Sequence, residues 1–364
     1  MSAQAVAEWI LDANTCFLIG GGCSACAGKP LIEGLTERVK KNLSDEAKTV
    51  FSNLNGTFGR APTIEDLVNY LLDYRRLLSS KRTLDDEVWT VGEIDEEVHA
   101  IQRGIVDAVG TKWEGSETHK RFFRRLAGQK SRSVCDIFTL NYDTVVEASL
   151  EDLKFPSIDG FRGAENAYFD AEVYDEPPSG GGRFRVYKLH GSVNWVRDVD
   201  GTVQRRPWDP PERRECVVVY PAEQKYVQTQ YGAYETLLSL FRRRLREPKP
   251  NNKLVVLGYS FRDEHINVAI EDSIRDEKSN LTVYAFFGPE EDPVAQESRL
   301  RELADRCKGR FNALVGQRAF IGPGLEEEEW ETVKFLDLWK FENLVEVLVG
   351  EKHEPKLAVH SQGN

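Results

Sequence analysis

The sequence predicts an α/β protein built on a doubly wound, Rossmann-like parallel sheet with a helical insertion module and C-terminal helices. A short apolar run, Thr15–Ile19, ends in three glycines, which is typical of a buried strand that enters a tight turn. Later apolar runs alternate with segments of helical periodicity, as the strands of a parallel sheet do. With 364 residues, 40% of them hydrophobic, the chain is long enough to bury a full core.

The order of the elements follows from periodicity. Residues 3–12, 229–245 and 266–274 are predicted helices, and residues 31–129 repeat apolar side chains at three- and four-residue spacing, which predicts a block of helices. The later predicted strands are Val134–Leu140, Phe184–Leu189, Cys216–Val219, Lys253–Leu257 and Leu281–Phe287. We therefore expect a Rossmann-like domain over residues 1–300 with 31–130 as the inserted helical module. Residues 301–364 are expected to form a C-terminal helical extension and a flexible tail.

The composition argues against several classes of function. The formal net charge of −12 disfavours broad binding to nucleic-acid phosphates. The arginines at 242–244 are interpreted as a solvated face, with a contact to a phosphate or a partner as the alternative. Six cysteines scattered through a long acidic chain predict reduced thiols. No apolar run approaches the roughly 20 residues that span a bilayer, so we expect a cytoplasmic protein without membrane contact.

The first candidate site is the glycine turn Gly20, Gly21 and Gly22, with Ser24 and Pro30 behind it. Gly20 and Gly22 permit positive φ and let backbone N–H groups approach a pyrophosphate, so this turn is predicted to bind a nucleotide. An ordinary strand-to-helix turn is the alternative, since such turns also collect glycine.

Two other interpretations of this loop are disfavoured. A hydrolase nucleophile elbow needs a small residue two positions after its serine, where this chain has Cys26. Cys23 and Cys26 have the spacing of a metal or redox pair, but no second cysteine pair or nearby histidine completes a zinc set. We therefore predict no metal site.

Polar residues also end the next two strands. Asn141 and Asp143 follow the second strand, and His190 follows the third, where side chains of a parallel sheet reach a common crevice. The alternative for Asn141 and Asp143 is that they cap the helix that begins at about residue 144. The histidines interpreted as solvent-facing are His99, His119, His353 and His360.

A second glycine-serine turn follows the apolar strand Lys253–Leu257. Gly258 and Ser260 are placed to hold the other half of a dinucleotide, and Asp263 is available to a ribose hydroxyl. For Asp263 the alternative is again a helix cap.

In this order, the four segments resemble the sirtuin superfamily, and more closely the sirtuin-like domains of bacterial antiphage defence proteins. The first loop matches the pattern Gly-x-Gly-x-Ser-x-x-x-Gly-x-Pro over residues 20–30. TLNYD at 139–143 corresponds to the family's Asn-x-Asp element, and KLHGS at 188–192 and GYSFRDEHIN at 258–267 are similar to the histidine and second glycine-serine motifs. The inserted helical block is also typical of the defence branch.

The resemblance implies cleavage of NAD, as substrate, to nicotinamide and ADP-ribose. Deacylating sirtuins carry Asp-Phe-Arg where this chain has Leu31-Ile32-Glu33, and they carry a four-cysteine zinc module that this chain lacks, so peptide deacylation is not expected. The hypothesis assigns catalysis to Asn141, which positions the attacking water, and to His190, which accepts a proton. Asp143 would hold the nicotinamide carboxamide, and the glycine turn and the two serines would bind phosphate oxygens.

The resemblance also implies a biological setting. We expect an antiphage effector of the abortive-infection type that forms a homo-oligomer and works with a separately encoded HerA-type ATPase. The alternatives are a binding module for NAD or ADP-ribose without turnover, and a structural subunit of a defence complex. An ADP-ribosyl or acyl transferase that acts on protein is a further alternative.

Overall fold

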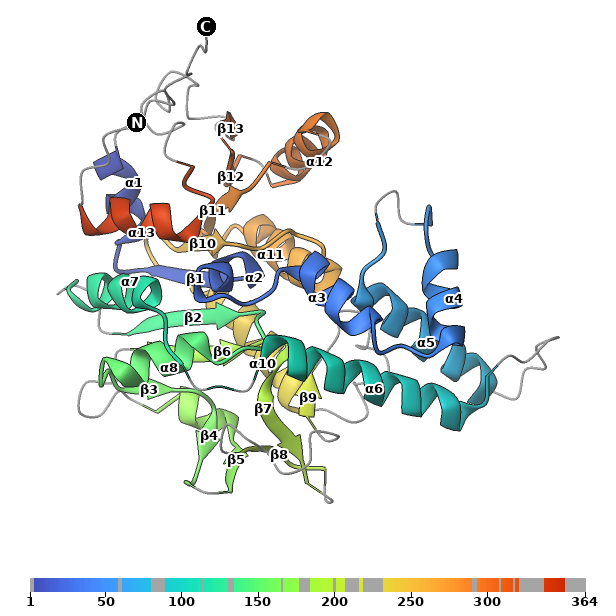
Figure 1. Ribbon diagram of the computed structural model, residues 1–364. Helices are drawn as coiled ribbons and strands as arrows, with labels where there is room; N and C mark the ends of the chain where they lie inside the picture. Colours follow the sequence, from blue (N-terminus) through green and yellow to red (C-terminus); the bar gives the residue numbers. More distant parts are fainter. Residues whose placement is uncertain are drawn as a thin grey trace, which may run out of the picture.

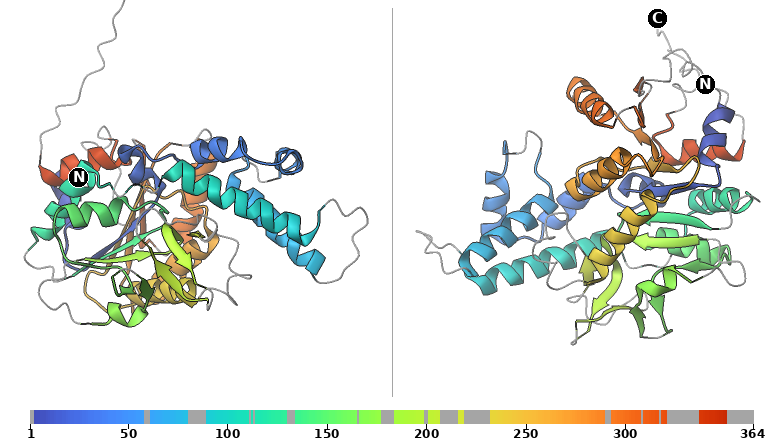
Figure 2. Two further views of the ribbon diagram at one scale, coloured as in Figure 1. Left: turned by 60° about the horizontal axis from the view of Figure 1, so that its bottom comes forward. Right: turned by 180° about the vertical axis from the view of Figure 1, so that it is seen from behind.

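The computed structural model describes residues 3–57, 61–79, 89–110, 112, 114–129, 134–164, 166–176, 184–198, 201–206, 216–218, 232–289, 293–307, 309–316, 318–320 and 337–350. A twisted sheet with helices on both faces forms the body, and a block of helices projects from one side of it (Figure 1). The two further views show the same projection (Figure 2). Among the described helices, none is both long and apolar enough to cross a membrane.

The main sheet has the strand order β13-β12-β11-β10-β1-β2-β6-β3. All neighbours pair in parallel except β12 and β13, so the doubly wound parallel sheet predicted from the sequence is confirmed. The bounds are β1 Thr15–Ile19, β2 Cys135–Thr139, β3 Ser157–Ile158, β6 Phe184–Lys188, β10 Lys253–Leu257, β11 Thr282–Phe287, β12 Phe311–Val315 and β13 Arg318–Phe320. Because β1 lies between β10 and β2, the strand order reverses there, and the crevice beyond its carboxyl end is where such sheets bind ligands.

Each face of the sheet is covered by its own layer of helices. One layer consists of α1 Ala3–Ile10, α7 Glu117–Ala127, α8 Val145–Asp152 and α13 Phe341–Val349, which share a hydrophobic core with the strands. The other consists of α10 Gly232–Leu245, α11 Glu264–Arg275 and α12 Pro293–Arg306, which share a second core. Strands buried on both faces explain why the sequence shows continuous apolar runs rather than alternation.

The projecting helices form a separate core. They are α3 Ile32–Lys40, α4 Asp45–Asn53, α5 Ile64–Ser79 and α6 Val91–Val109, and their apolar faces pack mainly on one another. Helix α7 also falls in the predicted module 31–130, but it packs against the sheet. The module therefore contains two kinds of helix, and we use the term insertion for α3 to α6 alone.

A small antiparallel sheet, in the order β4-β5-β8-β7-β9, flanks the main one. Its strands are β4 Phe161–Arg162, β5 Ala167–Phe169, β7 Gly191–Arg197, β8 Val203–Arg205 and β9 Cys216–Val218. The predicted strand Cys216–Val219 was assigned to the parallel sheet, and this is wrong, because β9 pairs antiparallel with β7. A short apolar run does not specify its partner strand. Residue 219 lies outside the described residues.

The region after residue 301 is not only helical. Strands β12 and β13 extend the main sheet, and every residue of Phe311–Val315 is buried. The expectation of a purely helical extension is corrected here, because this run becomes a strand by pairing with β11, a contact with another element that local periodicity does not show. Helix α13 supplies the expected helical part, whereas the expected flexible tail, residues 351–364, lies outside the described residues.

One predicted solvent-facing histidine is buried. His119 in α7 has 0% of its surface exposed and packs against Phe341 of α13, with 4.8 Å between ring centroids. The interpretation of His119 as solvent-facing is therefore wrong, because a helix from the far end of the chain covers it. His99 in α6 is exposed as predicted, and His353 and His360 lie outside the described residues.

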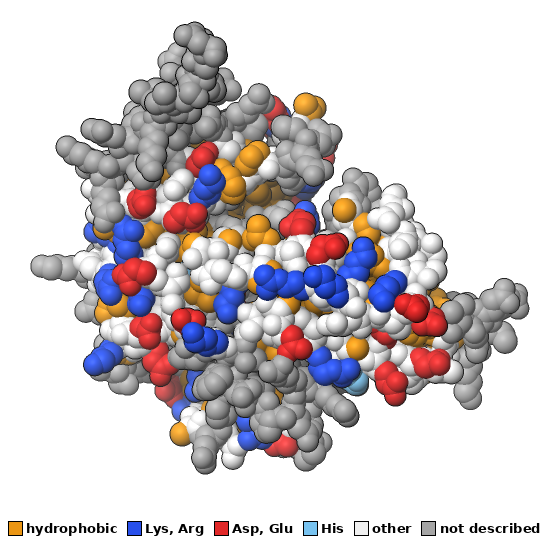
Figure 3. Space-filling view, viewed as in Figure 1, with side chains coloured by type: hydrophobic (Ala, Val, Ile, Leu, Met, Phe, Trp, Pro, Cys, Tyr) orange, Lys and Arg blue, Asp and Glu red, His pale blue; other side chains and the backbone are white. Residues whose placement is uncertain are grey.

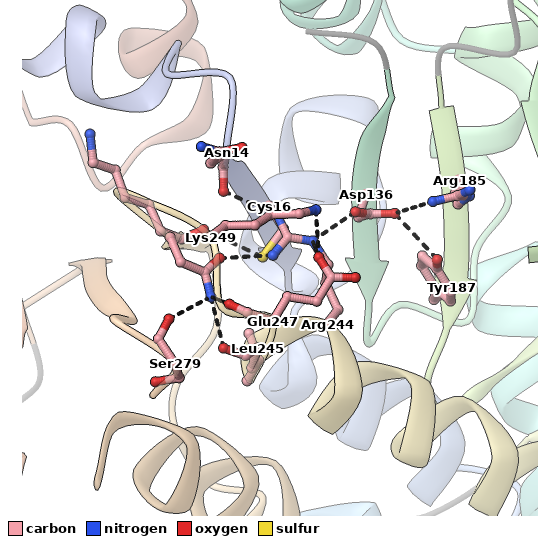
Figure 4. A network of polar contacts seen from close by, with 12 residues as sticks. Asn14, Cys16, Asp136, Arg185, Tyr187, Arg244, Leu245, Glu247, Lys249 and Ser279 are labelled. Carbon is pink, nitrogen blue, oxygen red and sulfur yellow. Dashed lines mark hydrogen bonds and ion pairs between the residues drawn. The ribbon is translucent and has the colours of Figure 1, made fainter. Parts of the chain in front are cut away.

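The arginine run at 242–244 contains one deeply buried member. Arg244 is 7% exposed and donates to Asp136 Oδ2 and Asn252 Oδ1, both at 2.8 Å, and to the Asn14 carbonyl at 3.0 Å. This polar network fastens α10 to the amino ends of β1 and β2 (Figure 4). The interpretation of the run as a solvated face is wrong for Arg244, whereas Arg243 is half exposed.

Acidic and basic side chains are interspersed on the face seen in Figure 3.

Candidate active site

A cavity of about 580 Å³ lies at the carboxyl ends of the central strands. The turns after β1, β2, β6 and β10 meet there, as expected for a crevice at a point where the strand order reverses. Every residue predicted from the sequence as a site residue lines this one cavity, namely Gly20, Gly21, Gly22, Ser24, Pro30, Asn141, Asp143, His190, Gly258, Ser260 and Asp263.

The two glycine turns are pressed against each other. A Cβ on Gly20 would lie 2.5 Å from the Gly258 carbonyl oxygen, and a Cβ on Gly22 would lie 2.8 Å from the Gly258 Cα. Only a residue without a side chain allows this approach. Gly258 also has a φ of 63°, in the left-handed region that favours glycine.

The expected role of Gly20 and Gly22 is corrected by their hydrogen bonds. Neither residue has positive φ, and the Gly20 and Gly22 N–H groups donate to the carbonyl oxygens of Leu257 and Gly258 at 2.8 and 2.9 Å. Their backbone donors thus join the two loops rather than point at a pyrophosphate. Gly21 also lines the cavity. It is exposed, and a Cβ on it would meet no atom within 4 Å, unlike a Cβ on Gly20 or Gly22.

Asn141 ties the end of β2 to the first turn. Its Nδ2 donates to the Gly20 carbonyl at 3.1 Å and to Ser24 Oγ at 2.8 Å, and the side chain is buried. Both amide hydrogens are therefore used, and Oδ1 is the polar atom with which this side chain can accept from a ligand. The N-cap residue of α8 is Thr144, so Asn141 does not cap this helix.

Asp143 does serve the helix. Its Oδ1 accepts from the N–H of Val145, the first residue of α8, at 3.0 Å, whereas the N-cap position belongs to Thr144, so Asp143 supports the start of the helix without being its cap. Lys188 reaches the same place from β6, donates to the Asp143 carbonyl and pairs with Glu147 at 3.0 Å. Through these two contacts, the buried lysine joins the end of β6 to the turn after β2 and to α8.

His190 is paired with a carboxylate. Its Nε2 lies 2.8 Å from Asp263 Oδ2. Both residues are buried, with 5% of the surface of His190 and 3% of that of Asp263 exposed. Since an ionised carboxylate can only accept, Nε2 carries a proton, and whenever the ring is neutral Nδ1 is the nitrogen with the lone pair.

Asp263 combines this contact with a cap. Its Oδ1 accepts from the N–H groups of His265 and Ile266 at the start of α11, so both carboxylate oxygens are engaged. The expected contact with a ribose hydroxyl is thus replaced by a contact with His190. Burial raises the pKa of Asp263, but the hydrogen bond and charge of His190 and the two backbone donors bring it below its ordinary value.

Glu65 was not predicted from the sequence. It lies in the first turn of α5, lines the cavity and accepts a hydrogen bond from the Tyr142 hydroxyl at 3.3 Å. Burial raises the pKa of this carboxyl, opposed by the charge of His190 and by the bond from Tyr142. No motif marks Glu65, because a glutamate in a first helical turn is common and its approach to the sheet depends on how the insertion folds back.

The cysteines of the first loop are thiols. Cys23 is buried and Cys26 is half-buried, and burial raises the pKa of both. Among the residues that the structure describes, no three histidine, cysteine or acidic side chains gather as a metal site would require.

Comparison with known proteins agrees with this architecture. Residues 136–307 match the family model described as a SIR2-like domain, a segment that includes Asn141, His190 and Asp263 but begins after the first glycine turn and the insertion. Together with the sheet topology, this match confirms the expected sirtuin-like, Rossmann-type fold.

Two solved structures of Sir2 homologues are similar to this chain over most of its length. A Sir2 homologue in complex with NAD is 11% identical over 95% of this chain and 94% of its own, with a TM-score of 0.42. A mutant Sir2 homologue in complex with ADP ribose is 12% identical over 97% of this chain and 100% of its own, with a TM-score of 0.40. No curated protein matches the sequence.

Proposed function

We propose that this protein is an NAD glycohydrolase that cleaves NAD to nicotinamide and ADP-ribose. The observation that supports it most directly is the buried His190–Asp263 pair in the same cavity as Asn141 and both glycine turns. The volume of about 580 Å³ is within the range of small-molecule sites. The SIR2-like match of residues 136–307 supports NAD as the nucleotide.

The reaction breaks the bond between ribose C1′ and the nicotinamide nitrogen. The bonding electrons pass to the nicotinamide ring, which leaves as a neutral molecule, and C1′ and the ring oxygen share the positive charge that remains. A water oxygen then bonds to C1′, and its proton goes to His190 Nδ1, since Nε2–H stays with Asp263. Asn141 Oδ1 accepts from the attacking water or a ribose hydroxyl.

The remaining contacts orient the dinucleotide. Asp143 Oδ2 accepts from the nicotinamide carboxamide, while its Oδ1 stays with the helix. Ser24, whose oxygen accepts from Asn141, donates its own proton to a phosphate oxygen. The Gly21 backbone and the exposed Ser260 hydroxyl complete the phosphate contacts.

The test is release of nicotinamide from NAD by purified protein. We expect Asn141→Ala and His190→Ala to lower the rate by about 100-fold or more, since each removes a group that acts on the water. His99→Ala changes an exposed histidine on α6 and is the matched control, with a rate equal to that of the wild type.

Calorimetry with ADP-ribose separates catalysis from binding alone. Folded Asn141 and His190 variants that bind ADP-ribose but release no nicotinamide support the hydrolase. A wild-type protein that binds ADP-ribose without any release, alone or with its partner, would instead be a binding module, and the hydrolase proposal would be withdrawn.

The sirtuin-like resemblance also supports a cytoplasmic antiphage role in a homo-oligomer that a HerA-type ATPase gates. Size-exclusion chromatography of the chain alone and with such an ATPase, followed by nicotinamide assays of each peak, tests the assembly. A chain that elutes as a monomer and has the same rate in both mixtures contradicts it.

A further inference from the structure

The insertion contributes a carboxylate to the cavity that its own helix does not need. At the start of α5, Asp66 Oδ2 accepts from both the N–H and the hydroxyl of Thr63, at 2.7 and 2.9 Å. The cap of α5 is therefore complete without Glu65. Glu65 Oε1 instead accepts from the Tyr142 hydroxyl at 3.3 Å, and both residues line the cavity.

The neighbouring carboxylates are committed elsewhere. Asp143 uses one oxygen to accept from the Val145 N–H at the start of α8, and Asp263 divides its two between α11 and His190. Glu65 makes one long hydrogen bond to a neutral phenol, and its Oε2 makes none with the residues that the structure describes. Glu65 is half-buried, so this second oxygen is open to a group that enters the cavity, and positive charge that develops there would meet a carboxylate with few competing partners.

We propose that Glu65 stabilises the positive charge that develops on the ribose C1′ and ring oxygen as nicotinamide leaves. This rests on the proposed glycohydrolase function and adds a residue to it. The departing nicotinamide takes the bonding electrons with it, so the site must meet a new cation, and carboxylates perform this role in glycoside hydrolysis. Glu65 forms no bond and transfers no proton; it acts by its charge.

The insertion thereby completes the site. The sheet supplies Asn141 and His190, and the insertion supplies a carboxylate that lines the same cavity. The charge on C1′ and the ring oxygen develops only as the bond to nicotinamide breaks, so the effect of Glu65 falls on kcat rather than on the affinity for NAD or for the neutral sugar of the product.

The experiment uses the full chain under conditions where the wild type releases nicotinamide. Glu65→Gln keeps the size and an oxygen that can accept from Tyr142. We expect kcat to fall by about 100-fold with KM for NAD within about threefold, and ADP-ribose affinity within about threefold. Asp73→Asn, on the same helix with an exposed carboxylate, is the matched control and keeps the wild-type kcat.

The pH profile provides a second readout. Glu65 must be ionised to act, and its raised pKa places the acid-side loss of kcat at a higher pH than an ordinary glutamate would. Glu65→Gln loses this contribution of Glu65 and keeps any acid-side loss that the other groups of the site cause. Tyr142→Phe removes the hydrogen bond but keeps the carboxylate, and we expect its kcat to fall by less than about tenfold.

The possible failures are distinguishable. A wild-type kcat in Glu65→Gln overturns the role of Glu65 and leaves the glycohydrolase intact. Equal losses of kcat in Glu65→Gln and Tyr142→Phe, or a loss of ADP-ribose affinity as large as that of kcat, mean that Glu65 only shapes the wall. A wild type that releases no nicotinamide under any condition overturns both proposals.

Discussion

His119 makes the stability of the protein depend on pH. Its ring is fully buried where α7 packs against α13, and neither ring nitrogen has a hydrogen-bond partner among the residues that the structure describes. Burial lowers its pKa from 6.5 to about 4, which keeps the ring neutral in the folded protein. We expect His119→Leu, which replaces the ring with an apolar side chain of similar volume, to stabilise the protein.

The magnitude follows from proton linkage. The unfolded chain binds the proton at the ordinary pKa of 6.5 and the folded chain only at about 4, so stability falls as pH drops below about 6.5. The full loss is 2.5 pKa units at 1.36 kcal/mol each, or about 3 kcal/mol, and about 2 kcal/mol of it is lost between pH 7.5 and pH 5. Removing two unpaired buried nitrogens adds about 1 to 3 kcal/mol at every pH.

The assay is urea unfolding of both proteins at several pH values from 7.5 to 5. The free energy of unfolding of the wild type should fall by about 2 kcal/mol more than that of His119→Leu over this interval. Carboxylates titrate in both proteins, so their contribution cancels in the difference. Parallel pH profiles, or a variant less stable than the wild type at pH 7.5, would refute the argument that an unpaired neutral ring is buried there.

Three further substitutions test the framework of the site. Gly258→Ala places a Cβ 2.5 Å from a backbone nitrogen of the first glycine turn, so we expect about 2 to 3 kcal/mol lower stability in denaturant titration; an unchanged midpoint contradicts this. Arg244→Met leaves its carboxylate partner in β2 buried and should cost about 3 to 5 kcal/mol in the same assay, whereas the exposed Arg243→Met should cost less than about 0.5. In Asp263→Asn, the cap of α11 holds the amide oxygen, so the NH₂ group faces His190 and forces its proton onto Nδ1. Nicotinamide release should then fall by at least about 100-fold with ADP-ribose affinity unchanged, and a rate within tenfold of the wild type would show that the tautomer is unimportant.

The sequence predicts those site residues that the parallel strands of the sheet bring together. Asn141, His190 and Gly258 each follow a strongly apolar run, and parallel strands bring their carboxyl ends to one edge whatever the loops do. Local pattern is therefore enough to bring these residues together. It is not enough to assign each hydrogen bond, as the N–H groups of Gly20 and Gly22 illustrate, because their acceptors belong to a loop more than two hundred residues away.

The features that the sequence did not predict depend on tertiary packing. His119 belongs to a polar-looking segment and is buried only because α13 returns to cover α7. Arg244 looks like its arginine neighbours and differs from them only by facing Asp136. Glu65 enters the cavity because the insertion folds back against the turn after β2, an approach for which no short motif exists. In each case the decisive neighbour is distant in sequence.

The insertion has a hydrophobic core of its own, yet it forms one wall of the cavity. Such a part can be exchanged as a unit. A chimera that carries the insertion of a related protein would keep the His190–Asp263 pair at the ends of the strands while placing different side chains against the cavity. The SIR2-like match covers residues 136–307 and leaves that wall out, so two proteins that share this match can differ in the part of the cavity that the insertion lines.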